Sequence, residues 1–354
     1  MRFIHIADVH LGAAPEAGTA YSEGRAQELW DTFSGVIAQC EREQTDLLLI
    51  AGDLFHRQPL LRELKEVNYL FGKMSHTKVV LIAGNHDYIR KDSFYRSFQW
   101  SDNVYPLFGR EMESVCLEEL DTEVYGLSYH DREIQEPLYN EVQPSGSARY
   151  SILLAHGGDE KHIPIRWEAL GRSEFDYIAL GHIHKQQNMI PEKAIYAGSL
   201  EPTDRNDAGH HGYIRGEITE HGVRTEFVPC AKREYICLAL QVKESMTNGS
   251  VRDGIRQMIE ERGVQNLYRF VLQGFRDPDV VFIPENMDFY GNVLEVVDET
   301  KPAFDFQKIW EKNHDNLIGK YIETFSGCEQ GSVEHQALYE GVQALLENAD
   351  GYDR

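Results

Sequence analysis

The first part of the chain alternates short apolar runs with longer segments of helical periodicity. Residues 2–9, 47–51 and 79–83 form the apolar runs, which are typical of buried strands. Residues 23–43 and 59–74 place apolar side chains at the three- and four-residue spacing of an amphipathic helix. This β-α-β-α-β order predicts an α/β fold in which helices cover the sheet layers.

The middle of the chain carries shorter strands. Residues 115–126 alternate loosely and predict an antiparallel pair. The apolar runs 152–155 and 177–180 end on His-Gly-Gly and on Gly-His-Ile-His. Residues 194–198 and 211–219 are predicted to close a second sheet, so we expect a first domain at 1–230.

From residue 234 the strand and helix pattern restarts. The predicted elements are a strand at 236–242, a helix at 251–262 and strands at 267–272 and 293–297. They predict a small α/β capping domain at 231–300. Two amphipathic segments, 304–325 and 332–346, then predict an acidic helical segment at 301–354.

Composition narrows the class of protein. No apolar run approaches the roughly 18 residues of a membrane helix, and the start of the chain, interrupted by Asp8 and His10, is unlike a signal sequence. The five cysteines are odd in number and scattered, which favours reduced thiols in a cytoplasmic protein. A net charge of -23 argues against a strong autonomous nucleic-acid binder. It leaves open a nuclease whose metal ions neutralise its carboxylates.

Side chains of metal-binding type follow five of the predicted strands. They are Asp8, His10, Asp53, Asn85, His86, His156, His182 and His184. If the strands lie side by side, these groups converge at one sheet edge. Carboxylate, imidazole and amide oxygen suit Mn, Fe or Zn. Eight groups exceed the needs of one ion, so two ions that share a carboxylate fit better, at a spacing of about 3.5–4 Å.

The spacing within two of these strand ends also favours a metal site. Residues two apart on a strand point to the same side, so Asp8 with His10, and His182 with His184, could each present two ligands. A residue such as His156, taken alone, is more simply explained as a buried core histidine. Five strand ends that all carry such groups would be an improbable accident.

The order of these motifs resembles a known superfamily. Asp-x-His, Gly-Asp, Gly-Asn-His-Asp, His and Gly-His-x-His, over roughly residues 1–230, are similar to the calcineurin-like metallophosphoesterases. Gly-Asp-Leu-Phe-His-Arg-Gln-Pro at 52–59, Gly-Ser-Leu-Glu-Pro at 198–202 and the α/β cap resemble the SbcD and Mre-type DNA repair nucleases, in particular YhaO-like exonucleases. The resemblance implies a four-layer α-β-β-α sandwich with a small α/β capping domain and a C-terminal helical segment.

The resemblance also implies a role for each site residue. One metal would be held by Asp8, His10, Asp53 and His184, and the other by Asp53, Asn85, His156 and His182. His86 would be the general acid/base, with Asp87 orienting its ring. His56 resembles a residue that contacts nucleic acid in that group, and it is equally well explained as a surface loop histidine.

The implied activity is a DNA repair exonuclease that uses two divalent ions, with Mn favoured and Fe or Zn as alternatives. A hydroxide bridging the metals would attack phosphorus, and His86 would assist the leaving oxygen. The resemblance further implies an SbcC/Rad-type ATPase partner and a homodimer.

Two alternative functions remain. One is a phosphodiesterase or phosphatase for a small nucleotide or a phosphoprotein. The other is a scaffold with a dead site, which the intact ligand set argues against.

Overall fold

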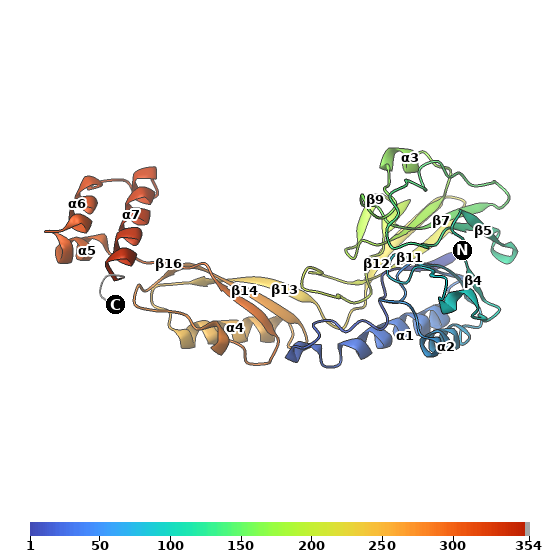
Figure 1. The fold of residues 1–354 in the computed structure, drawn as a ribbon, viewed down its shortest axis with the longest axis horizontal. Helices are drawn as coiled ribbons and strands as arrows, with labels where there is room; N and C mark the ends of the chain where they lie inside the picture. Colours follow the sequence, from blue (N-terminus) through green and yellow to red (C-terminus); the bar gives the residue numbers. More distant parts are fainter. Residues whose placement is uncertain (351–354) are drawn as a thin grey trace. The chain divides into compact units, whose positions relative to one another are not determined.

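The computed structural model describes residues 1–350 (Figure 1), and the chain divides into two compact units. The first unit comprises Met1–Cys237, Arg262–Tyr268 and Tyr290–Leu294. The second comprises Leu238–Glu261, Arg269–Phe289 and, of the described residues, 295–350. The expected domain boundaries near residues 230 and 300 stay predictions.

The first unit contains two six-stranded sheets, and the first of these has the order β12-β11-β1-β2-β3-β4. Its strands are β1 (Arg2–Ile6), β2 (Leu47–Ala51), β3 (Lys78–Ile82), β4 (Val104–Pro106), β11 (Gly212–Thr219) and β12 (Gly222–Pro229). Strands β1 to β4 are parallel to one another, whereas β11 runs antiparallel to β1. All five residues of β2 are buried, as expected for a parallel strand covered on both faces.

The second sheet has the order β5-β6-β7-β8-β10-β9. Its strands are β5 (Glu113–Leu117), β6 (Thr122–Gly126), β7 (Tyr150–His156), β8 (Tyr177–Gly181), β9 (Gln187–Ile190) and β10 (Ala194–Tyr196). The predicted antiparallel pair is the β5–β6 hairpin. The expectation that residues 211–219 also belong here is wrong, because β11 pairs with β1. Its buried Ile214 and Ile218 face the core shared by both sheets, so their burial pattern does not reveal which sheet holds the strand.

Three apolar clusters define the layers of the first unit. Helices α1 (Arg25–Glu43) and α2 (Leu61–Phe71) pack against one face of the first sheet. A second cluster, which includes Leu49 and Leu154, lies between the sheets, and a third covers the outer face of the second sheet. The α-β-β-α prediction is confirmed, although the fourth layer is thin: it consists of loops and the short helix α3 (Trp167–Gly171).

The remaining strands form a third sheet, β13-β14-β15, with β16 paired to β14. Its strands are β13 (Tyr235–Val242), β14 (Leu267–Arg276), β15 (Val293–Asp298) and β16 (Lys301–Pro302), and it is accompanied by α4 (Asn248–Arg262). Helix α4 buries Val251, Ile255 and Ile259 at the expected spacing.

The C-terminal part consists of α5 (Phe306–Asn313), α6 (Leu317–Thr324) and α7 (Val333–Asp350). These helices share an apolar cluster that includes Ile318, Ile322 and Val342. The predicted segment 304–325 is split because the Asn316 side chain accepts hydrogen bonds from the first N–H groups of α6 and starts a new helix. Within residues 1–350, no helix combines the length and apolarity needed to cross a membrane.

Candidate metal centre

The candidate ligands lie where five strands of the two sheets end. Asp8 and His10 follow β1, Asp53 follows β2 and Asn85 follows β3. From the second sheet, His156 closes β7, and His182 and His184 follow β8. These parallel strands present their carboxyl ends at a common edge, as the sequence predicted.

The backbone at these positions differs from the extended strand that sequence reasoning assumed. Asp8, His10 and Asp53 have φ angles of 49°, 50° and 50°, and His182 has 99°. The i, i+2 strand argument therefore gives the wrong reason for the convergence, because the chain has already left the strand conformation. Left-handed conformations of non-glycine residues cost about 1–3 kcal/mol each and are concentrated at functional sites.

Close contacts between side-chain atoms link all seven candidate ligands into one chain of neighbours. One group consists of Asp8, His10 and His184, whose ligand atoms lie within 4.8 Å of one another. In this group His10 Nε2 lies 3.0 Å from His184 Nε2. A second group consists of Asp8, Asp53 and His156.

Asp53 connects the second group to His10, and Asn85 connects His156 to His182. Asp53 Oδ2 lies 4.0 Å from His10 Nε2 and 3.4 Å from His156 Nε2. Asn85 Oδ1 lies 2.9 Å from His156 Nε2 and 3.1 Å from His182 Nδ1. Asp53 thus contacts one histidine from each of the two ligand sets that the family resemblance assigns to separate ions.

The two carboxylates of the centre are buried, and their environments pull their pKa values apart. Burial raises the pKa of Asp8 to about 6, against the opposing charges of His156 and His184. Burial also acts to raise the pKa of Asp53. The charge and the hydrogen bond of His156, together with the charge of His10, outweigh it, and the pKa of Asp53 lies well below its usual range.

The pKa values of the histidines in the centre are also shifted in opposite directions. Burial lowers the pKa of His10 well below its usual value, and burial together with the charge of His156 lowers the pKa of His182 to about 4. Burial also opposes the charged forms of His156 and His184. Nevertheless, the charge of Asp53 raises the pKa of His156 to about 9. The hydrogen bond to Asp207 likewise raises the pKa of His184 to about 9.

This donor set fits divalent metal ions. Imidazole nitrogens, carboxylate oxygens and an amide oxygen meet in a space from which water is largely excluded, and His10 and His184 turn nitrogens toward each other. Buried polar groups gathered this closely need compensation. Mn, Fe and Zn suit these ligand types.

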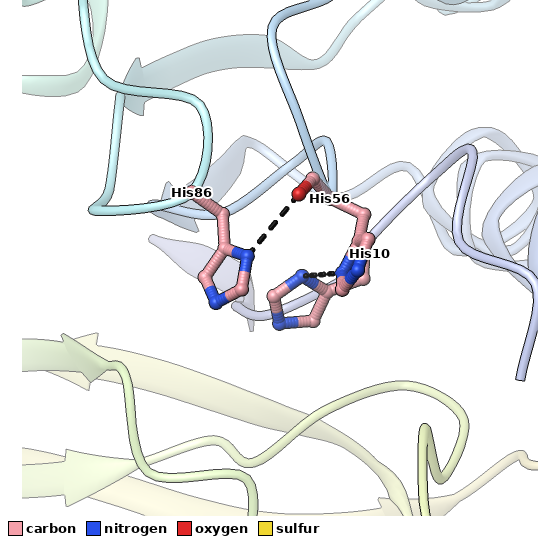
Figure 2. A group of neighbouring side chains, drawn as sticks. All are labelled: His10, His56 and His86. Carbon is pink, nitrogen blue, oxygen red and sulfur yellow. Dashed lines mark hydrogen bonds between the residues drawn. The ribbon is translucent and has the colours of Figure 1, made fainter. Parts of the chain in front are cut away.

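His86 lies beside this centre with one ring nitrogen already engaged. Its Nδ1 lies 3.1 Å from the backbone carbonyl oxygen of His56, a contact drawn as a dashed line in Figure 2. Because a carbonyl only accepts, Nδ1 carries the proton and donates it, and Nε2 is the nitrogen left for chemistry. The backbone N–H of His86 donates to Asp53 Oδ1 at 2.8 Å, which ties the residue to the centre.

The expectation that Asp87 orients the His86 ring is wrong, because the Asp87 carboxylate is engaged elsewhere. The Asp87 carboxylate accepts from the N–H groups of Gly84 and Phe55 and from the Tyr95 hydroxyl. Asp87 therefore holds the turn after β3 against the loop after β2, and the His56 carbonyl contacts the ring instead. Burial, followed by the charge of Asp53, raises the pKa of Asp87 to about 7.

His56 is close to the centre and exposed. Its ring stacks against His86 with centroids 5.0 Å apart, and its Nδ1 lies 3.4 Å from His10 Nδ1 (Figure 2). Two further residues were missed by sequence reasoning: Asp159 contacts His182 and Asp207 contacts His184. Asp159 follows His156 by three residues, which is a weak signal, and Asp207 has no local motif.

A two-sheet sandwich with histidine, aspartate and asparagine ligands at one edge defines a metallophosphoesterase. The chain belongs to the calcineurin-like phosphoesterase family, whose sequence profile matches residues 1–186. Over 304 residues it is 28% identical to the uncharacterized metallophosphoesterase YhaO of Bacillus subtilis (strain 168), which covers 77% of this chain and 72% of YhaO.

Two archaeal proteins are also similar, both named DNA double-strand break repair protein Mre11. That of Methanocaldococcus jannaschii is 30% identical over 220 residues, 58% of each chain. That of Archaeoglobus fulgidus is 27% identical over 258 residues, 64% of this chain and 56% of its own. The chain thus spans just over half the length of these two relatives.

Proposed function

We propose that this protein is a two-metal phosphodiesterase that acts on DNA, as a repair exonuclease. The observation that carries the proposal is the position of Asp53 between two groups of ligands, with His86 bonded to the same carboxylate. Family membership supports phosphoester hydrolysis, and the similarity to two double-strand break repair proteins supports DNA as the substrate.

In this proposal Asp8, His10, Asp53 and His184 hold one ion, and Asp53, Asn85, His156 and His182 hold the other. When bound, two divalent ions acidify a water molecule and stabilise charge on the phosphoryl oxygens. We propose Mn as the native metal, with Fe or Zn as alternatives of similar ligand preference. His56 is proposed to contact the DNA.

His86 is proposed to supply the proton. The His56 carbonyl keeps Nδ1 in use as a donor, so Nε2 is the atom that can hold a proton for the leaving oxygen. General acid catalysis of this kind contributes about 10²–10⁴-fold to a rate. The benefit is greatest for a poor leaving group such as the alkoxide of a DNA strand.

The test is digestion of end-labelled duplex and single-stranded DNA with Mn, with Mg and with EDTA, beside bis-nitrophenyl phosphate. We expect Mn-dependent shortening of DNA that EDTA abolishes. His86→Asn should lose about 10²–10⁴-fold on DNA and much less on the nitrophenyl diester, whose leaving group needs little protonation. His76→Asn is the matched control, because His76 is exposed and bonded to Asp46.

A second candidate function is hydrolysis of a small nucleotide or of a phosphoprotein at the same centre. The net charge of -23 favours it, since long polyanions are repelled. Cleavage of the small diester with DNA left intact, both alone and with an SbcC/Rad-type ATPase added, would replace the nuclease proposal with this one. The ATPase partner, a homodimer and a cytoplasmic location stay predictions from the sequence.

A further inference from the structure

Two histidines of the Gly-His-x-His motif each contact a carboxylate from a separate loop. Asp159 Oδ2 lies 2.8 Å from His182 Nε2, and Asp207 Oδ2 lies 3.0 Å from His184 Nδ1. The carboxylates therefore engage opposite ring nitrogens. The remaining nitrogens point into the centre: His182 Nδ1 is 3.1 Å from Asn85 Oδ1, and His184 Nε2 is 3.0 Å from His10 Nε2.

We propose that Asp159 and Asp207 are positioning residues, one for each ion of the proposed two-metal centre, on which this inference rests. An ionised carboxylate only accepts hydrogen bonds, so it fixes the proton of each imidazole on the outer nitrogen and the lone pair on the inner one. Partners of this kind orient metal-binding histidines, and their loss typically lowers metal affinity about 10–100-fold.

The loop that carries Asp159 is held firmly. The hydroxyls of Tyr129 and Tyr139 donate to the His156 carbonyl, and that of Tyr196 donates to the Gly157 carbonyl. All three tyrosines are buried. The turn that supplies the candidate ligand His156 thereby also fixes the start of the segment leading to Asp159.

The Asp159 carboxylate is itself oriented. Its Oδ1 accepts the backbone N–H groups of Lys161 and His162, at 2.8 and 3.0 Å, while Oδ2 faces His182. The His162 ring adds a contact of 2.9 Å from Nδ1. Its own loop therefore holds the Asp159 carboxylate in the orientation that contacts His182, even though 48% of the side chain is exposed.

Asp207 is oriented in a similar way and is more buried. Its Oδ2 accepts from the backbone N–H and the hydroxyl of Thr203, each at 2.8 Å, as well as from His184. Its side chain is 12% exposed. The two carboxylates come from loops 48 residues apart in the sequence, at 159 and 207, so each can be removed without changing the other.

The experiment measures Mn²⁺ binding to the full-length apoprotein, without DNA, by calorimetry and by electron paramagnetic resonance. Wild type should bind two ions that give a coupled spectrum. Asp159→Ala and Asp207→Ala should each weaken one ion about 10–100-fold, and the double variant should weaken both. Asn at either position keeps an acceptor oxygen and should restore part of the affinity.

Asp46→Asn is the matched control. Asp46 also accepts from a backbone N–H and contacts a histidine, His76, but this pair lies apart from the candidate ligands. Unfolding of each apoprotein monitors the fold, and the Asn variants carry the test if an Ala variant does not fold. Affinities that match the Asp46→Asn control would overturn the inference, as would a double variant that affects one ion alone.

A further outcome would assign Asp159 differently. Its carboxylate, His162 and His182 form a group whose ligand atoms lie within 4.8 Å. Three ions in wild type, and two in Asp159→Ala, would make Asp159 a ligand and overturn its positioning role. Because binding is read without hydrolysis, the expected affinity losses in a protein that cleaves no diester would refute the proposed function while supporting this inference.

Discussion

The two sheets hold their candidate ligands by different means. In the first sheet, Asp8, His10 and Asp53 all adopt left-handed backbone conformations. Main-chain hydrogen bonds join the two loops: Asp8 N–H donates to Gly52 O, and His10 N–H donates to Asp53 O. The backbone itself aims these side chains.

In the second sheet the histidines are held through their outer ring nitrogens. His156 Nδ1 contacts the Ala51 carbonyl at 2.8 Å, and His182 and His184 contact Asp159 and Asp207. We call the candidate ligands on the first sheet the first half of the centre and those on the second sheet the second half. The difference predicts which kind of substitution should disrupt each half. The first half should fail when a new side chain displaces its backbone, and the second should fail when a hydrogen-bonding partner is removed.

The largest effect should come from Gly84→Ala, which disturbs the first half. A Cβ there would lie 2.7 Å from the backbone nitrogen of Asp53 and 2.7 Å from His156 Nε2, and would collide with Asp53 Oδ1. We expect a loss of about 1–3 kcal/mol of stability from overpacking and loss of measurable Mn²⁺ binding. Urea unfolding and Mn²⁺ titration check this.

Gly35→Ala provides the control for that variant. Gly35 lies within α1, and a methyl group added there would have no other atom within 4 Å, apart from its own helix backbone and chain neighbours. Alanine in a helix should raise stability by about 0.5–1 kcal/mol and leave metal binding unchanged. If Gly84→Ala bound Mn²⁺ as wild type does, the backbone-fixed description of the first half would be wrong.

In the second half the next effect should come from Tyr139→Phe, which adds no atom that could collide with a candidate ligand. The Tyr139 hydroxyl accepts from the backbone N–H of His156 at 3.0 Å and donates to its carbonyl at 3.2 Å. Its removal leaves the buried N–H without that acceptor, which should cost about 1–3 kcal/mol. Urea unfolding of the apoprotein gives the value.

Tyr129→Phe separates the two contributions. Tyr129 donates to the same carbonyl, which keeps its bond from Tyr139, so this variant should cost only about 0.5–1.5 kcal/mol. The double variant should cost more than the sum, because the carbonyl then loses both donors. A Tyr129→Phe loss equal to or larger than that of Tyr139→Phe would contradict the importance of the His156 N–H.

Much of this arrangement was predictable from local pattern. Continuous apolar runs located the parallel strands, and the polar residues after them located the edge where Asp8, Asp53 and His156 meet. These signals work because buried parallel strands and their carboxyl-terminal loops are encoded within a few residues. The fold class and the shared edge follow from them.

The remainder depends on contacts between distant parts of the chain. The partnership of Asp207 with His184 joins loops that no periodicity connects, and β11 could have completed either sheet. The family resemblance implied that Asp87 orients the His86 ring, yet the Asp87 carboxylate accepts from Gly84, Phe55 and Tyr95 instead. Sequence proximity does not determine which way a buried carboxylate turns.

The smallest effect is expected at His5. This histidine lies between the two sheets, and its side chain contacts a hydroxyl group rather than a carboxylate. Its Nδ1 contacts the Tyr177 hydroxyl at 3.0 Å, and burial lowers its pKa to about 3, although the Leu180 backbone acts to raise it. His184, which contacts Asp207, shifts the other way, to a pKa of about 9. A carboxylate partner thus decides which buried histidine is charged.

The consequence of the His5 shift is a loss of stability in acid. The folded protein keeps His5 neutral, whereas the unfolded chain takes up a proton below a pKa of 6.5. Stability is therefore complete above that value and falls as the pH drops toward about 3, by about 1 kcal/mol at pH 5.5. His5→Leu combined with Tyr177→Phe removes both polar groups and should reduce the acid loss by that amount. Urea unfolding at pH 7.5 and 5.5 measures the difference, and an unchanged acid loss in the double variant would show that the His5 imidazole is already protonated in the folded protein.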